Sequence, residues 1–166
     1  MFCKRVSKYN PIHRNTKGHY TRSDWTSYHD IGHRFDKGVL TKDRYLAVEN
    51  SYVVAVYSFL NTYSIASLKI SELELYDIQR VDLQNTNSDP MREIIKEGYL
   101  LQGNEIEYCV RLILREKIWC KLTGAEGIFI HFGYDYYMYF GCDLDMNLLP
   151  EPPEGIFFET FSTPYE

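Results

Sequence analysis

FGYDYYMYFGCDLD, residues 132–145, contains four tyrosines, two phenylalanines and three aspartates, and it has no lysine or arginine. The run GIFIHF (127–132) before the turn and the run DYYMYFG (135–141) after it both have a strand-like composition. Gly133-Tyr134 separates them, and glycine followed by another residue is typical of a type II′ turn between two strands. We therefore predict a β-hairpin made of strands 127–132 and 135–141.

A two-residue turn fixes the residues that face each other across this hairpin: Phe132 and Asp135, Ile130 and Tyr137, and Ile128 and Tyr139. The other face then holds Phe129, His131, Tyr136, Met138 and Phe140. Neither face has the polar composition of an ordinary solvent-facing strand surface. One face must serve the core, and monomeric proteins seldom leave a second patch of this kind without a partner. We interpret the second face, together with Asp143 and Asp145, as a partner surface.

The rest of the chain predicts an α+β fold. Thr41 is a good N-cap for a helix over 42–62, whose apolar residues recur at helical spacing with Glu49 at the edge of the buried face. A second helix is predicted over 105–122, before Gly124, and a shorter one over 91–97. Residues 67–77 resemble a strand with a bulge near Ser71, and 156–161 resemble a last strand.

The predicted architecture is one domain, residues 1–166, in which two long helices pack on a small, mainly antiparallel sheet with a C-terminal hairpin. Residues 1–40 are polar, aromatic and interrupted by glycine, which favours turns and one short helical turn around 24–33.

Charge is distributed unevenly along the chain. Residues 1–44 contain ten Lys/Arg and four Asp/Glu, whereas residues 122–166 contain eight Asp/Glu and no Lys or Arg. Such an acidic segment attracts a basic protein partner and repels nucleic acid. The alternative is a solvated acidic face with the basic N-terminal segment folded against it.

The cysteines and the apolar segments indicate the cellular compartment of the protein. Cys3, Cys109, Cys120 and Cys142 are widely spaced and form no CxxC pair, which favours reduced thiols, and Cys109 is expected to pack within its helix. The first ten residues lack the apolar run of a signal peptide, and no stretch has the roughly 20 apolar residues of a membrane span. We expect a cytoplasmic protein with no membrane partner.

Catalytic signatures are weak. GxSxG, GxGxxG and GxxxxGK[ST] are all absent, which removes the enzyme classes that depend on them. His29 and His33 are four residues apart, but Gly32 weakens a helix there, so we interpret them as surface or packing residues and predict no metal site and no cofactor. His131 among tyrosines could support acid–base chemistry, but its surroundings are acidic and would repel an RNA backbone.

Trp25 lies in a second dense patch, GHYTRSDWTSYHDIG (18–32). Polar residues flank this large side chain on both sides. It either packs its loop onto the core or serves as an aromatic anchor for a partner.

Three segments, GHYTRSDWTSYHDIGHRFD, LTKDRYLAVENSYVVAVYSFL and GIFIHFGYDYYMYFG, resemble small bacterial proteins of toxin systems. Specifically, the chain resembles the immunity proteins of contact-dependent growth inhibition. This resemblance implies a stoichiometric inhibitor, not an enzyme, which binds the C-terminal nuclease domain of its cognate toxin, an RNase or tRNase, and blocks the basic active-site surface. It is also compatible with an additional host factor that binds to the toxin in the same complex.

The resemblance supplies no residue motif, so the predicted toxin-binding residues come from the aromatic and acidic patches: Tyr134, Asp135, Tyr137, Tyr139, Asp143, Asp145, Glu151 and Trp25. Two other hypotheses stay open. The first is a small-molecule enzyme or binding protein with a pocket lined by His131 and tyrosines. The second is a homo-oligomer in which the aromatic patch meets its own copy.

Overall fold

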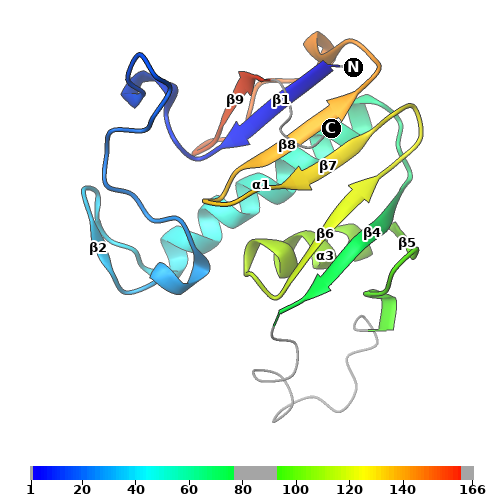
Figure 1. The fold of residues 1–166 in the computed structure, drawn as a ribbon, viewed down its shortest axis with the longest axis horizontal. Coiled ribbons are helices and arrows are strands. Elements are labelled where there is room, and N and C mark those ends of the chain that lie inside the picture. Colours follow the sequence, from blue (N-terminus) through cyan, green and yellow to red (C-terminus); the bar gives the residue numbers. More distant parts are fainter. Residues whose placement is uncertain (1, 77–92, 162–166) are drawn as a thin grey trace.

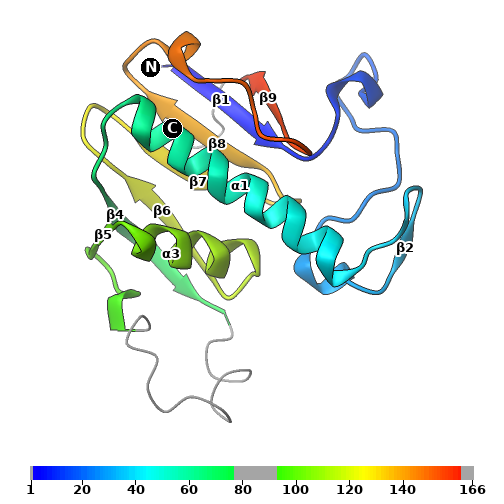
Figure 2. The same cartoon turned by 180° about the vertical axis from the view of Figure 1, so that it is seen from behind.

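The computed structural model describes residues 2–76 and 93–161. In this part of the chain, two α-helices pack on one face of a seven-stranded sheet (Figures 1 and 2). The helices are α1 (Lys42–Thr62) and α3 (Asn104–Leu114). The strands of the sheet are β1 (Phe2–Ser7), β4 (Ser67–Leu75), β5 (Leu100–Gln102), β6 (Ile118–Thr123), β7 (Phe129–Phe132), β8 (Met138–Cys142) and β9 (Phe157–Thr160).

The strand order is β5-β4-β6-β7-β8-β1-β9, and every neighbouring pair is antiparallel. The α+β class and the antiparallel sheet are confirmed, but the sheet is larger than predicted and only α1 is long. Two short strands, β2 (Arg34–Phe35) and β3 (Gly38–Val39), form a separate hairpin. Short 3₁₀ turns lie at Pro11–His13, Tyr28–Asp30 and Met146–Leu148.

Strand β1 was missed because its sequence, FCKRVS, mixes charged with apolar residues. It lies between β8 and β9, so its hydrogen-bonding partners come from the other end of the chain. Lys4 faces Phe140 and Thr160, and Arg5 faces Tyr139 and Glu159. Pairing with distant residues, not local pattern, determines this strand.

The predicted helix over 105–122 is wrong in its second half. Helix α3 ends at Leu114, Glu116 adopts a left-handed φ of 56°, and β6 begins at Ile118. The error has a geometric cause, because Val110, Leu114, Ile118 and Leu122 are spaced by four, a spacing that fits both a helix and a strand. In β6 the burial alternates strictly, as in a strand with one face on the core.

Helix α1 has the predicted bounds, and the Thr41 side chain accepts a hydrogen bond from the Arg44 amide as its N-cap. Glu49, expected at the edge of its buried face, is instead fully buried. The carboxylate oxygens of Glu49 accept hydrogen bonds from Arg111 (2.6 Å) and Arg115 (2.6 and 2.8 Å), so an ion-pair network joins α1 to α3 and to the residue after it.

The hairpin of 127–145 exists, but its register differs from the prediction. Phe132 faces Met138 and Ile130 faces Phe140, so the connection is the five-residue loop 133–137 instead of a two-residue turn. The shift of three residues is odd, and an odd shift exchanges the two faces of one strand. Met138 and Phe140 therefore join Ile130 on the helix side, while Tyr139 joins His131 on the other side.

Two predicted strands are confirmed. Strand β4 has a register shift between Ser71 and Glu74, with Glu72 at a φ of 53°, which is the predicted bulge. Strand β9 lies within the predicted range 156–161. The helix predicted over 91–97 lies partly outside the described residues, and Glu93 and Ile94 form a 3₁₀ turn.

Candidate functional site

The 133–137 loop joins β7 to β8, and hydrogen bonds between its own backbone groups stabilise its conformation. The amide of Gly133 donates to the Tyr137 carbonyl (2.9 Å), and the amide of Tyr137 donates to the Tyr134 carbonyl (3.2 Å). Asp135 and Tyr136 both have a positive φ, 56° and 64°, which is uncommon for residues other than glycine. These two conformations turn Tyr136 into the core and leave Tyr134 91% exposed.

Tyrosine hydroxyls from the core hold this loop in place. Tyr52 donates to the carbonyl of Tyr136 (2.6 Å), and the Tyr136 hydroxyl donates to that of Tyr45 (2.7 Å). Tyr9 donates to the carbonyl of Asp135 (2.8 Å). These three bonds, two to α1 and one to the segment after β1, offset the backbone strain at Asp135 and Tyr136, so the loop is preorganised.

A cleft of about 460 Å³ lies beside the loop, between the end of α3, the start of β6 and the segment around Ser27. A smaller hollow of about 260 Å³ shares part of its wall and adds Glu74. We call the two together the aromatic cleft, because most of the large side chains that line them are aromatic: Tyr76, Trp119, Phe132, Tyr134, Tyr136 and Tyr137.

The charged side chains at the aromatic cleft are all acidic among the described residues that line it. They are Glu74, Glu116 and Asp135, with no lysine, arginine or histidine. Glu74 accepts a hydrogen bond from the Tyr76 hydroxyl, and this bond raises the pKa of Tyr76 to about 12. Aromatic faces beside carboxylates form a site suited to a cation.

Three of the predicted contact residues lie at this site. Tyr134 and Asp135 are exposed in the loop, and Tyr137 is half-buried at its end. The Tyr137 hydroxyl accepts a hydrogen bond from Arg14 (3.2 Å), and its ring lies 5.3 Å from that of Tyr9. Tyr137 is therefore held by the protein, whereas Tyr134 projects from it.

Two other predicted contact residues, Trp25 and Tyr139, are only 4% and 7% exposed, which corrects their assignment as partner contacts. Trp25 packs against the ring of Tyr136 at 4.7 Å, so it joins its loop to the core. Tyr139 lies on the sheet face opposite the helices, next to Phe161. Neither side chain offers enough surface to anchor a partner.

Lys8 stabilises the position of Trp25 within the segment 18–32. Its ammonium lies 3.2 Å from the Asp24 carboxylate and within 4.0–4.1 Å of the ring centres of Tyr9 and Trp25. Burial lowers the pKa of Lys8 to about 8, although Asp24 favours the charged form. We interpret this cluster as structural, because its members hold Trp25 in the core.

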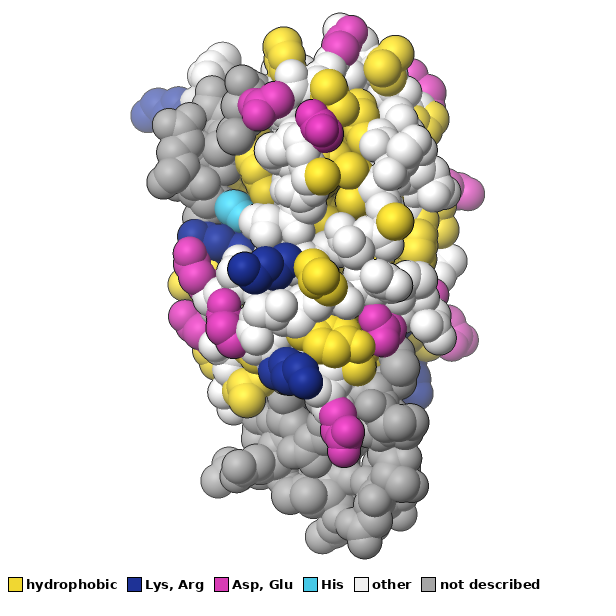
Figure 3. Space-filling model, turned by 90° about the vertical axis from the view of Figure 1, so that its right-hand side faces the viewer, with side chains coloured by type: hydrophobic (Ala, Val, Ile, Leu, Met, Phe, Trp, Pro, Cys, Tyr) yellow, Lys and Arg dark blue, Asp and Glu magenta, His cyan; other side chains and the backbone are white. Residues whose placement is uncertain are grey.

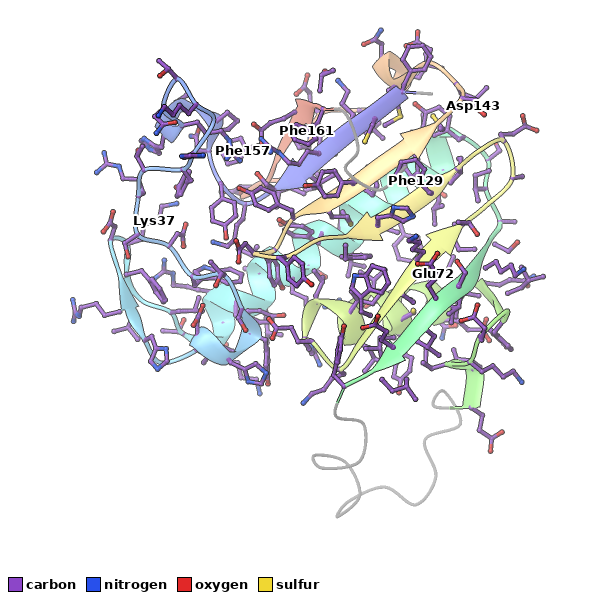
Figure 4. All side chains as sticks on the ribbon, viewed as in Figure 1. Lys37, Glu72, Phe129, Asp143, Phe157 and Phe161 are labelled. Atoms are coloured by element: carbon purple, nitrogen blue, oxygen red, sulfur yellow. The ribbon has the colours of Figure 1, made fainter. Side chains whose placement is uncertain are left out.

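The remaining predicted contacts, Asp143, Asp145 and Glu151, are exposed but follow the other end of β8 in the chain. Figure 4 labels Asp143 at that end. Five strand residues at about 3.4 Å each put roughly 17 Å between that end and the loop. Asp145 caps the 3₁₀ turn that begins at Met146 by accepting from the Asn147 amide (2.9 Å). The tyrosines and these acids thus do not form one patch.

The acidic C-terminal segment is partly paired with the basic N-terminal one. Glu159 on β9 binds Arg5 (2.9 Å) and Arg14 (3.1 Å), as the alternative interpretation of the charge distribution expected. Figure 3 shows acidic, basic and hydrophobic side chains mixed on another side of the molecule. The excess of carboxylates at the aromatic cleft is therefore a local feature, and it does not extend over the side shown in Figure 3.

His131 is 6% exposed and does not line the aromatic cleft. Its ring packs against that of Phe129, with ring centres 4.6 Å apart and the planes tilted by 32°, and burial lowers the pKa of His131 to about 4. His29 and His33 are exposed, as expected. Within residues 2–76 and 93–161, no group of three or more His, Cys, Asp or Glu side chains is arranged to hold a metal ion.

Sequence reasoning missed Trp119, Glu116 and Tyr76. Trp119 and Glu116 were placed inside the overextended helix, although the alternation in IWCKLT was the signal of a strand. Tyr76 directly follows β4, beside the start of β6.

In comparisons with known proteins, no family model matches this chain, and neither a curated protein nor a solved structure matches it. No helix in the described part of the chain is long and apolar enough to cross a lipid bilayer.

Proposed function

We propose that this chain is an immunity protein that binds and neutralises a cognate bacterial toxin domain, a cytoplasmic RNase or tRNase, without catalysing a reaction. The observation that carries the proposal is the preorganised 133–137 loop. It presents Tyr134 almost fully to solvent beside an aromatic cleft whose charged lining residues are acidic. A rigid, exposed tyrosine beside a preformed pocket is typical of the residues that anchor a protein interface.

The charge of the site favours a basic partner. A nuclease has a basic cleft that attracts the phosphates of its substrate, and Glu74, Glu116 and Asp135 complement such a surface. The same carboxylates repel RNA and DNA, so nucleic acid is not the proposed ligand. Asp143, Asp145 and Glu151 would contribute to long-range attraction more than to the contact itself, because they lie at the far end of β8.

The test is a growth-rescue assay combined with binding. The proposal requires a toxin gene immediately upstream of the gene for this chain. Induction of its C-terminal domain should stop growth, and co-expression of this chain should restore it. The purified proteins should form a one-to-one complex whose association rate falls steeply with added salt. Growth arrest that persists with the chain well expressed would exclude the proposed function.

A small-molecule binding protein is the second candidate, because the volume of the cleft lies within the range of about 300–1,000 Å³ that is common for ligand sites. It differs from the pocket expected from the sequence, since tyrosines line the cleft but His131 does not. Retention of a small cationic metabolite through purification, detected by mass spectrometry of the denatured protein, would favour it.

A further inference from the structure

The aromatic cleft presents hydrogen-bond acceptors and ring faces to an occupant, while two of its donors are already engaged. The indole N–H of Trp119 donates to the Phe132 carbonyl (2.8 Å), and the Tyr76 hydroxyl donates to Glu74. The carboxylates of Glu116 and Asp135 are acceptors, and both residues are exposed. A ligand group that donates hydrogen bonds and accepts none therefore complements the exposed carboxylates of the cleft.

We propose that the aromatic cleft receives one arginine side chain of the protein partner, with its guanidinium on the rings of Trp119 and Tyr134 and its N–H groups toward Glu116 and Asp135. This inference rests on the proposed function and names the chemical group that the site recognises. An arginine guanidinium has five N–H donors and no acceptor, is always charged, and stacks on aromatic faces. A lysine ammonium lacks the planar face that two rings can hold.

Charge complementarity supports this occupant over an apolar one. The described residues lining the aromatic cleft carry three carboxylates and no cationic side chain. The imidazole Nε2 of His29 lies 3.9 Å from a carboxylate oxygen of Glu116, and both side chains are about half or more exposed to water. That contact is therefore weak and can be replaced by a guanidinium.

The first experiment uses this protein alone. The probe is Nα-acetyl-arginine amide, and the matched control is Nα-acetyl-citrulline amide, which has the same length but no charge. Amide NMR shifts at Trp119, Gly133 and Tyr134 should saturate with arginine at a dissociation constant on the order of millimolar, as expected for one side chain. The citrulline control should bind several-fold more weakly.

The decisive variant is Glu116→Gln, which keeps the shape of the side chain and removes its charge. It should weaken arginine binding by about threefold in the exposed cleft and weaken the toxin complex by about tenfold or more, where the pair is desolvated. The control Glu154→Gln changes an exposed carboxylate of the C-terminal segment that does not line the cleft, and it should alter neither binding constant. Unchanged thermal unfolding of Glu116→Gln confirms that the fold is retained.

The outcomes separate this inference from the proposed function. Equal binding of arginine and citrulline, no saturable shifts, or full toxin affinity in Glu116→Gln would overturn the arginine site, even if the chain still rescues growth. Saturable binding of arginine at the cleft without any toxin binding would keep the guanidinium site and reject the immunity function.

Discussion

Trp119 on β6 donates its indole N–H to the main-chain carbonyl of Phe132, the last residue of β7, over 2.8 Å. This bond ties the strand that precedes the hairpin to the point where the 133–137 loop begins. The wall of the aromatic cleft and the loop that carries Tyr134 are therefore parts of one hydrogen-bonded unit. A partner that contacts Tyr134 meets a preformed site.

Replacing Tyr134 with alanine should reduce the affinity for the toxin domain by about 2 kcal/mol, mostly through faster dissociation. Because its side chain is 91% exposed, the free energy of unfolding should change by no more than about 0.5 kcal/mol. Calorimetric titration and thermal unfolding measure the two effects. Leu148→Ala, at a site 67% exposed beyond the other end of β8, is the control and should bind normally. Wild-type affinity in Tyr134→Ala would remove the loop from the interface.

Gly141→Ala should destabilise the fold by about 1–3 kcal/mol, because it overpacks a tightly filled site. A Cβ at Gly141 would lie 2.0 Å from Cε1 of Phe129, whose ring therefore covers this glycine. Chemical denaturation measures the loss. The double variant Phe129→Ala/Gly141→Ala should be more stable than the sum of the single effects predicts, since the clash is gone. Strict additivity would argue against this contact.

Glu49→Gln should cost about 2–4 kcal/mol of stability, because Arg111 and Arg115 lose their shared carboxylate. Burial alone would raise the pKa of Glu49, but the hydrogen bonds from both arginines outweigh it and lower the pKa. A carboxyl with a lowered folded-state pKa stabilises the fold above its unfolded pKa of about 4.5, and this contribution is lost as the pH falls. Urea denaturation at pH 7 and pH 3 should show a smaller difference for Glu49→Gln than for the wild type.

His131 should make the fold sensitive to mild acid. Its folded-state pKa of about 4 lies below its ordinary value of 6.5, so between these values the unfolded chain binds more protons. Stability should therefore fall by about 2–3 kcal/mol as the pH decreases from 6.5 to 4. His131→Phe, which keeps a ring beside Phe129, should flatten this part of the pH profile.

Local patterns predicted the elements that are defined by their own residues. The bounds of α1, the bulge in β4 and the place of β9 follow from a cap, an alternation that changes phase, and a short apolar run. The existence of the β7–β8 hairpin followed from its composition. In each case, hydrogen bonds or apolar contacts close in sequence favour the same structure as the rest of the fold.

Elements that depend on distant residues were not predictable in this way. Strand β1 is defined by pairing with β8 and β9, and the register of the hairpin is set by tyrosine hydroxyls from Tyr9 and Tyr52 that bind the loop backbone. The odd register shift then decided which aromatic residues enter the core. It placed Phe140 on the helix side and Tyr139 on the opposite face, where Tyr139 is only 7% exposed, whereas Tyr134 in the loop is 91% exposed.

The sequence by itself determined an α+β chain with a long helix over 42–62, a tyrosine-rich hairpin and an acidic C-terminal segment, because composition and periodicity are local properties; the second long helix that it predicted is wrong in its second half. Only the tertiary structure decided where those residues point. It separated Tyr134 from Asp143 by the length of β8, and it brought Trp119 and Glu116 to the loop from the neighbouring strand and the end of α3. A binding site built from several elements depends on strand register and helix ends, which are fixed by long-range packing.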